Sequence, residues 1–131
     1  MKLEPQTNAE LDKLGRIVKD IGTAMLASLA DDGSLVTRPL ETLQLNAEGE
    51  LVFFTSANSA KVAQLTEDRH VNLAYVDSAN KRYLSVRGQS RMDRDEDTIN
   101  ALWSMEQKVF FPQGKNDPEL MVLRVKVRDA M

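Results

Sequence analysis

The chain contains no cysteine and only one histidine, His70, among its 131 residues. The missing thiols exclude a disulfide scaffold, cysteine-ligated zinc, thiolate catalysis and iron–sulfur clusters, and a single imidazole excludes a site built from several histidines. Apolar runs are short as well, since none approaches the roughly 20 residues that a membrane-spanning helix needs. The start of the chain, Met1 to Asn8, lacks the charged-then-apolar pattern of a secretory signal. We therefore expect a cytoplasmic protein without a metal site.

Neither sign of charge is in large excess, because 17 basic side chains stand against 20 acidic ones and leave a formal charge of −3. A general nucleic-acid binder normally shows a basic excess, so this class of protein is not expected. Repeats, low-complexity tracts and an internal linker rich in Gly, Ser or Pro are also missing. A chain of this length can bury a core of ordinary size. We expect a single domain over residues 1–131.

The spacing of apolar residues predicts a mainly β fold with flanking helices. A helix is expected over about residues 7–21, with Thr7 and Glu10 at capping-box spacing and Gly22 as its stop. Short helices are expected after Ser59 and near Asp95. Turn sequences divide the remaining apolar segments into strands, over 23–30, 35–45, 51–55, 71–76, 83–92 and 120–127. Because the strands are mostly consecutive, we expect a six- to seven-stranded antiparallel β-barrel or sandwich over about residues 23–127, whose first three strands form a meander.

Hydroxyl and amide side chains gather where the third predicted strand ends and a short helix begins. Ser59 and Lys61 stand at this helix start. Helix N-termini offer unpaired N–H groups and the positive end of a dipole, so the two residues can hold a phosphate. The alternative is an ordinary helix cap in which Asn58 or Ser59 satisfies the backbone and Lys61 is solvated. This segment by itself leaves both interpretations open.

A proline interrupts the second long strand. Pro39 cannot donate to a β-ladder, and proline is confined to edges, strand starts and bulges. Arg38 beside it can supply a second cation to the same anion, in the forked geometry that suits phosphate. The alternative is an edge-strand proline next to a surface arginine, and spacing does not separate the two.

Three of the seven aromatic residues fall within ten positions near the C-terminal third of the chain, namely Trp103, Phe110 and Phe111. A proline follows at once, and then a loop that contains Gly114. Such a cluster is either part of a core or an anchor for a partner or ligand. Both interpretations stay open at this point.

Several segments, taken in their order along the chain, resemble the general stress protein 26 branch of the pyridoxamine-5′-phosphate-oxidase-like flavoproteins. The resemblance covers about residues 8–127. The segments that carry it are Arg38-Pro39-Leu40, Phe53-Phe54-Thr55 with Ser59-x-Lys61, Asn72-x-Ala74-Tyr75, Tyr83-x-Ser85-Val86-x-Gly88, and Trp103 with Phe111-Pro112-x-Gly114-Lys115-x-Asp117-Pro118.

The resemblance implies a split β-barrel that binds FMN at the interface of a homodimer, and FAD and a deazaflavin stay open as alternatives. By this analogy Ser59 and Lys61 hold the FMN phosphate with help from Arg38. A second group lines the isoalloxazine edge through its backbone: Pro39, Leu40, Glu41 and Thr42.

The aromatic residues receive roles from the same resemblance. Phe54 and Thr55 are implied to lie under the flavin ring and ribityl chain, while Trp103 and Phe111 are implied to come from the other subunit. Two departures concern the ring edge: relatives often carry Met in place of Leu40, and Gln in place of Leu43. The second change removes a polar contact to the flavin.

The function expected from these residues is that of an FMN-binding general-stress-type flavoprotein, with flavin-dependent oxidoreductase activity on an unknown small substrate. Redox chemistry would be the flavin's own. No dedicated acid–base pair is found, and pyridoxamine phosphate oxidation itself is not favoured. Two alternatives stay open: a non-catalytic flavin or nucleotide carrier or sensor, and a cofactor-free β-barrel interaction domain.

Overall fold

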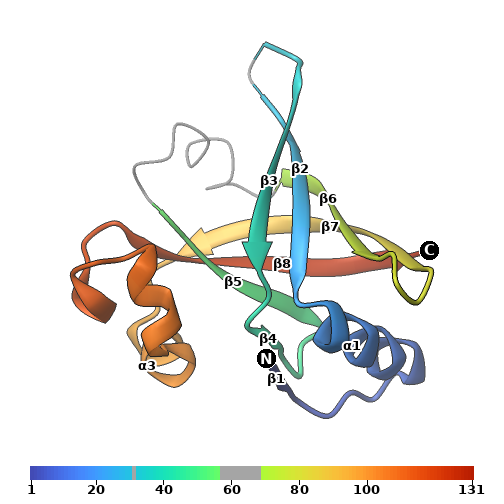
Figure 1. Ribbon diagram of the computed structural model, residues 1–131, viewed down its shortest axis with the longest axis horizontal. Helices are drawn as coiled ribbons and strands as arrows, with labels where there is room; N and C mark the ends of the chain where they lie inside the picture. The colour runs from blue at the N-terminus through green and yellow to red at the C-terminus, as the bar shows by residue number, and fades with distance from the viewer. Residues whose placement is uncertain (31, 57–68) are drawn as a thin grey trace.

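Figure 1 shows a computed structural model of the chain, which describes residues 1–30, 32–56 and 69–131. A mainly β fold is confirmed. The helices are α1 (Ala9–Ile21), α3 (Glu96–Leu102) and two 3₁₀ turns, η1 (Met105–Val109) and η2 (Gly114–Asn116). The strands are β1 (Lys2–Leu3), β2 (Thr23–Leu29), β3 (Leu35–Glu41), β4 (Gln44–Leu45), β5 (Glu50–Ser56), β6 (Arg69–Asp77), β7 (Arg82–Asp93) and β8 (Leu120–Ala130).

The strands form one eight-stranded sheet in the order β1-β4-β5-β8-β7-β6-β2-β3. Six of them are the long strands that the turn and apolar patterns predicted. The two-residue strands β1 and β4 raise the total above the expected six to seven. They pair with each other in parallel, and the other neighbouring strands pair antiparallel. Two-residue strands have no period to detect, which explains why the sequence pattern did not show them.

Both consecutive pairings of the expected meander are present, but the predicted strand 35–45 divides into β3, which pairs with β2, and β4, which pairs with β5. The division lies at Thr42 and Leu43. The backbone N–H of Thr42 donates to the carbonyl of Gly22 at 3.0 Å, whereas that of Leu43 donates to Val52 at 2.8 Å. Neighbouring residues thus bond to opposite ends of the sheet. β5 consequently pairs with β8 and β4 rather than with β3.

Pro39 lies within β3 and does not interrupt it, since the strand runs through to Glu41. β3 stands at the end of the strand order, where its free edge tolerates a residue without an N–H. The edge-strand interpretation is therefore correct for Pro39. Its neighbour Arg38 is half-buried rather than a surface side chain.

The ends of α1 and α3 are set by side-chain and glycine caps. Asn8, and not Thr7, is the N-cap of α1, and its Oδ1 accepts from the N–H of Glu10 at 2.8 Å. Gly22 ends α1 at φ 82°, a conformation that favours glycine. The helix expected to start near Asp95 is α3, and Asp95 is its N-cap. The short helix expected after Ser59 lies outside the described residues. None of the described helices is long and apolar enough to cross a membrane.

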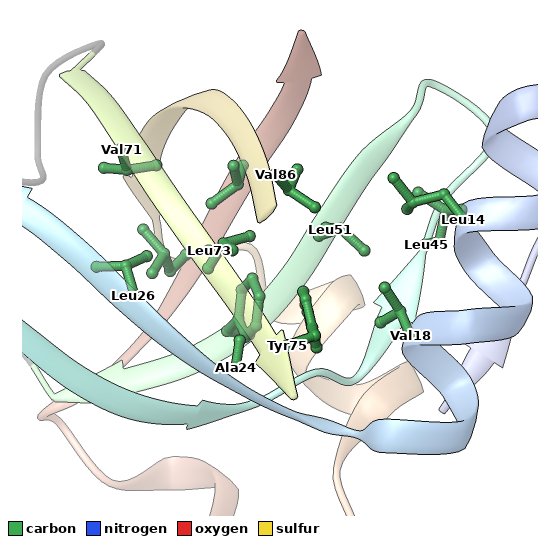
Figure 2. Packing of buried hydrophobic residues seen from close by; sticks show 13 residues of the cluster. Leu14, Val18, Ala24, Leu26, Leu45, Leu51, Val71, Leu73, Tyr75 and Val86 are labelled. Atoms are coloured by element: carbon green, nitrogen blue, oxygen red, sulfur yellow. The ribbon is translucent and has the colours of Figure 1, made fainter. Parts of the chain in front are cut away.

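The core is made of two clusters that share β5. The first, here the α1 cluster, is shown in Figure 2 and consists of Leu14, Val18, Ala24, Leu26, Leu45, Leu51, Phe53, Val71, Leu73, Tyr75, Val86, Leu123 and Val125. The second, here the α3 cluster, consists of Val52, Phe54, Ile99, Leu102, Phe111, Leu120 and Val122, with Leu43 and Trp103 packed against it. Alternate residues of β5 point to opposite faces and so enter different clusters.

The two helices accordingly cover different parts of the sheet. Figure 1 shows α1 and α3 well apart, with the β2–β3 hairpin rising between them. In Figure 2, Leu14 and Val18 of α1 point toward Leu45 and Leu51. This arrangement leaves the end of β3 and the end of β5 next to the α3 cluster, where they line a cavity.

Candidate functional site

A cavity of about 600 Å³ lies where the ends of β3 and β5 meet η1. Its volume is in the range of small-molecule sites, and its walls are mostly apolar with a few polar groups, as is usual for such sites. The lining residues are Thr23, Pro39, Leu40, Glu41, Leu43, Phe54, Thr55, Ser56, Glu106, Gln107, Phe110 and Phe111.

The aromatic wall of this cavity is held by the α3 cluster. Phe54 and Phe111 are only 8% and 5% exposed, and both face the cavity. Trp103 stacks on Phe54, with ring centroids 6.3 Å apart and an interplanar angle of 28°. Buried aromatic rings in contact hold one another in place. The wall is thus rigid on the β5 side, whereas Phe110, which is 75% exposed, stands at the mouth.

The end of β3 supplies the opposite wall through Pro39, Leu40 and Glu41. Thr42, predicted to belong to the same group, does not line the cavity. It is 1% exposed, its Oγ1 lies 2.8 Å from the Tyr75 hydroxyl, and its N–H is bonded to Gly22. Burial raises the pKa of Tyr75, so this hydroxyl stays neutral. Thr42 therefore supports the wall from behind.

Glu41 contributes a side chain as well as its backbone. It stands opposite Thr23 in the β2–β3 register, and its Oε2 accepts from Thr23 Oγ1 at 3.1 Å. Gly22 leaves room for the carboxylate, because a Cβ there would lie 3.0 Å from Glu41 Oε1. The carboxylate is thus positioned at the edge of the cavity by two elements.

Sequence reasoning missed three lining residues, Thr23, Glu106 and Gln107, and for Phe110 it left core and ligand anchor open. Gln107 is held in place, since its Oε1 accepts from the N–H and the hydroxyl of Ser104 at 2.6 and 2.7 Å. This is a capping box at the start of η1. A serine three residues before a glutamine is the signal that could have predicted this turn.

Comparison with known proteins supplies the family. Residues 9–131 match the family model described as Pyridoxamine 5′-phosphate oxidase like. The chain belongs to this family. The resemblance that the ordered motifs indicated is therefore confirmed.

Individual relatives agree with this assignment. The chain is 30% identical to the general stress FMN/FAD binding protein of Xanthomonas citri, with a TM-score of 0.78 over 95% of this chain and 88% of that one. It is 15% identical to general stress protein 26 of Bacillus anthracis, which shows the shared fold with a TM-score of 0.79 over 94% and 92% of the two chains. Protein bli-3 of Neurospora crassa is 24% identical, over 97% of this chain and 70% of that protein.

In this member of the pyridoxamine 5′-phosphate oxidase like family, Trp103 and Phe111 pack within their own chain. Both belong to the surroundings of Phe54. Within the chain, η1 and the residues on either side of it fold back onto β5. The expectation that Trp103 and Phe111 reach the flavin of another subunit stays a prediction. Phe111 then forms part of the cavity wall directly, and Trp103 acts through Phe54.

Of the three residues expected to hold a phosphate, only Arg38 lies within the described residues. Arg38 points to the face of β3 opposite Pro39 and Glu41, is half-buried, and does not line the cavity. Burial lowers the pKa of its guanidinium. Ser59 and Lys61 lie outside the described residues. Within the described ranges, no group of three or more His, Asp or Glu side chains is arranged to hold a metal ion.

Proposed function

We propose that this chain is a flavin-binding protein of the general-stress type that takes FMN, with the isoalloxazine ring in the cavity between β3, β5 and η1. The observation that carries the proposal is the cavity itself. Five of its lining residues are ones that the family resemblance associates with the ring and ribityl chain: Pro39, Leu40, Glu41, Phe54 and Thr55. Membership of the family supports the same conclusion, as does the similarity to a Xanthomonas citri protein named as FMN/FAD binding.

The chemistry of the walls fits a flat ring that is apolar on its faces and polar at its edge. Phe54 and Phe111 offer nearly buried apolar surface, and Thr55 and Ser56 bring hydroxyls to the end of β5. Aromatic side chains stack favourably on flat ligands. Leu43 also lines the cavity, so that position gives the ring an apolar contact instead of a polar one.

The phosphate end is assigned to Arg38, Ser59 and Lys61. Arg38 is a half-buried cation on β3, one residue from the cavity wall at Pro39. Ser59 and Lys61 follow Ser56, the last residue of β5, by a few positions. An oxyanion held by charged and hydroxyl groups gains charge-assisted hydrogen bonds. This division puts ring and phosphate at different ends of one binding site.

Bound FMN would supply redox chemistry, which we propose is used on a small organic substrate. The chain's own residues would bind and orient the flavin. The α3 cluster holds Phe54 and Phe111 in place, and the contact of Thr42 with the Tyr75 hydroxyl fixes the end of β3. These apolar walls exclude water from one side of the cavity. Anaerobic addition of NADH or NADPH separates this activity from a carrier role, since a carrier's flavin would keep its visible absorbance.

We also propose that a second copy of the chain completes the protein as a homodimer. One outer sheet face carries exposed apolar side chains that share the same side of neighbouring strands: Met25, Leu29, Leu35, Val76 and Tyr83. Apolar patches of this kind are typical of protein–protein interfaces. Light scattering should give about twice the chain mass of 14.7 kDa. Leu35→Glu should lower that mass, and Ala9→Glu, which adds the same charge at the start of α1, should not.

The decisive experiment is a titration of purified protein with FMN and with riboflavin, followed by flavin fluorescence. Lys61→Ala should weaken FMN binding by roughly 1.5–3 kcal/mol, about ten- to a hundred-fold, because one charge-assisted phosphate contact is lost. Riboflavin lacks the phosphate and should be affected far less. Lys13→Ala on α1 is the matched control. Absence of a saturable FMN response contradicts the proposed function, and equal losses for both ligands contradict the phosphate assignment.

A further inference from the structure

The charged side chains that line the cavity between β3, β5 and η1 are of one sign. Two carboxylates line it, Glu41 on β3 and Glu106 on η1. Among the lining residues that the structure describes there is no Lys, Arg or His. Arg38, which is assigned to the phosphate of FMN, points to the opposite face of β3 and does not line the cavity. The described walls around the proposed ring position are thus negative, while the assigned cations serve the phosphate.

Glu41 is the better fixed of the two carboxylates. Its Oε2 accepts from Thr23 Oγ1 at 3.1 Å, and Gly22, at φ 82°, leaves room beside Oε1, where a Cβ would come within 3.0 Å. The Glu106 carboxylate makes no hydrogen bond or ion pair with any residue that the structure describes. A charge that is held in one position acts on a bound group without a cost of reorganisation. Glu41 is therefore the carboxylate whose effect on a bound ring can be argued from the structure.

The strand geometry of β3 sets how far this carboxylate is from the proposed ring position. Pro39 and Glu41 both line the cavity and lie on one face of β3, because residues two apart in a strand share a face. Two residues of a strand span about 7 Å. Pro39 is one of the walls assigned to the isoalloxazine ring. A ring packed against Pro39 therefore lies within the roughly 10 Å over which exposed charges still interact at ordinary salt.

Reduction of a flavin adds two electrons and two protons, and the reduced ring releases one of these protons near neutral pH. The reduced ring then carries one more negative charge than the oxidised ring. We propose that the Glu41 carboxylate disfavours this anionic ring relative to the oxidised one, and so lowers the reduction potential of bound FMN. Like charges at this separation repel, and a charge beside the ring is one of the means by which a protein tunes a flavin. The inference rests on the proposed function and goes beyond it, because it assigns to one side chain a preference between two redox states.

The test compares the reduction potential of FMN bound to the unmodified protein and to Glu41→Gln, whose amide oxygen can still accept from Thr23. Each FMN-loaded protein is reduced slowly without oxygen by xanthine and xanthine oxidase beside a reference dye, and the absorbances of flavin and dye give the potential. Because Glu41 is exposed, water weakens its effect. We expect the affinity for reduced FMN relative to oxidised FMN to rise about three- to tenfold in the variant. This ratio corresponds to a rise of about 15–30 mV, since tenfold is about 30 mV in a two-electron couple.

Two control variants separate a local field from a general loss of charge. Glu10→Gln removes the same charge from the exposed surface of α1 and should leave the potential unchanged. Glu106→Gln should raise the potential less than Glu41→Gln, because the Glu106 side chain is not held. Added salt should raise the potential of the unmodified protein more than that of Glu41→Gln, since ions screen the carboxylate. No rise in Glu41→Gln, or a rise that Glu10→Gln or Glu106→Gln equals, overturns the inference.

Failure of this inference is distinguishable from failure of the proposed function. The phosphate of FMN is the same in both redox states, so its contacts cancel in the ratio of the two affinities. If FMN binds and Glu41→Gln leaves the potential unchanged, only the role of Glu41 is wrong. A merely structural role of Glu41 would weaken oxidised and reduced FMN alike and would give that result. If the unmodified protein does not bind FMN, the proposed function is wrong, and the role of Glu41 is overturned with it.

Discussion

The two hydrophobic clusters on this sheet differ in their access to the cavity. The α1 cluster is closed and is here called the sealed part, whereas the α3 cluster borders the cavity and is here called the open part. In the α1 cluster most side chains have no exposed surface, and aliphatic residues predominate around Phe53 and Tyr75. The α3 cluster contains Phe54 and Phe111, and Trp103 packs against it. Phe54 and Phe111 also line the cavity. The first cluster stabilises the fold, and the second also forms a wall of the cavity.

β5 shows how closely the two parts are joined. Leu51 and Phe53 face the α1 cluster, while Val52 and Phe54 face the α3 cluster. Since side chains alternate along a strand, one residue separates a purely structural position from one that borders the cavity. Neighbouring substitutions on β5 should therefore have different consequences, and that difference can be measured.

The largest effect is expected from truncating the sealed part. Leu73→Ala removes a side chain with 0% exposure from the middle of the α1 cluster. The lost burial and the cavity that remains should lower the free energy of unfolding by about 2–5 kcal/mol. Urea denaturation followed by circular dichroism measures this change. Val109→Ala, at a position 80% exposed, should have little effect. Comparable losses for the two variants would contradict the assignment of Leu73 to a sealed core.

The next effect concerns the bond that joins the two parts. Thr42 and Tyr75 are both buried, and their hydroxyls are 2.8 Å apart, so Thr42→Val leaves the Tyr75 hydroxyl without this partner. The expected loss is about 1–3 kcal/mol of unfolding free energy. Tyr75→Phe should cost a similar amount. The double variant should lose less than the sum of the two, and strict additivity in this double-mutant cycle would show that the hydroxyls do not interact.

A smaller change in stability, with a change in binding, is expected in the open part. Phe111→Leu should lower the unfolding free energy by about 1 kcal/mol, because volume is mostly conserved. FMN affinity should fall about two- to tenfold as the aromatic contact is lost. Phe53→Leu, on the other face of β5, is the matched control: it should destabilise the protein and leave FMN affinity unchanged. An equal loss of FMN affinity in both variants would remove the distinction between the clusters.

The existence of the long strands could be predicted because their signals are local. Apolar runs bounded by turn residues are visible along the chain, and Gly22 and Asp95 end and begin helices as expected. Strand order could not be predicted in this way. The insertion of β8 between β5 and β7 depends on pairing over more than sixty residues, and the break at Thr42 depends on which distant carbonyl accepts each N–H.

The candidate site shows the same limit. Its β3 and β5 residues were predicted through family resemblance, and most of them line the cavity. Nothing in the sequence neighbourhood of Phe111 shows that it shares a cluster with Phe54 of its own chain. The side chain of Glu41 gained its role only from the register that puts Thr23 opposite it. Contacts across strands are what the linear pattern does not contain.

The smallest effect we predict is a pH dependence at the start of α3. The Thr98 hydroxyl, followed by backbone N–H groups and the charge of Arg124, holds the pKa of Asp95 below its usual value. A carboxyl whose pKa is lower in the folded protein adds stability above its unfolded pKa of about 3.9, and this contribution is lost as pH falls through the folded value. Asp95→Asn should therefore lower the melting temperature at pH 7 more than at pH 3. Asp12→Asn, which removes a carboxylate from the exposed side of α1, is the control. If the Asp95→Asn effect were as large at pH 3 as at pH 7, the ionised carboxylate would not be the stabilising group.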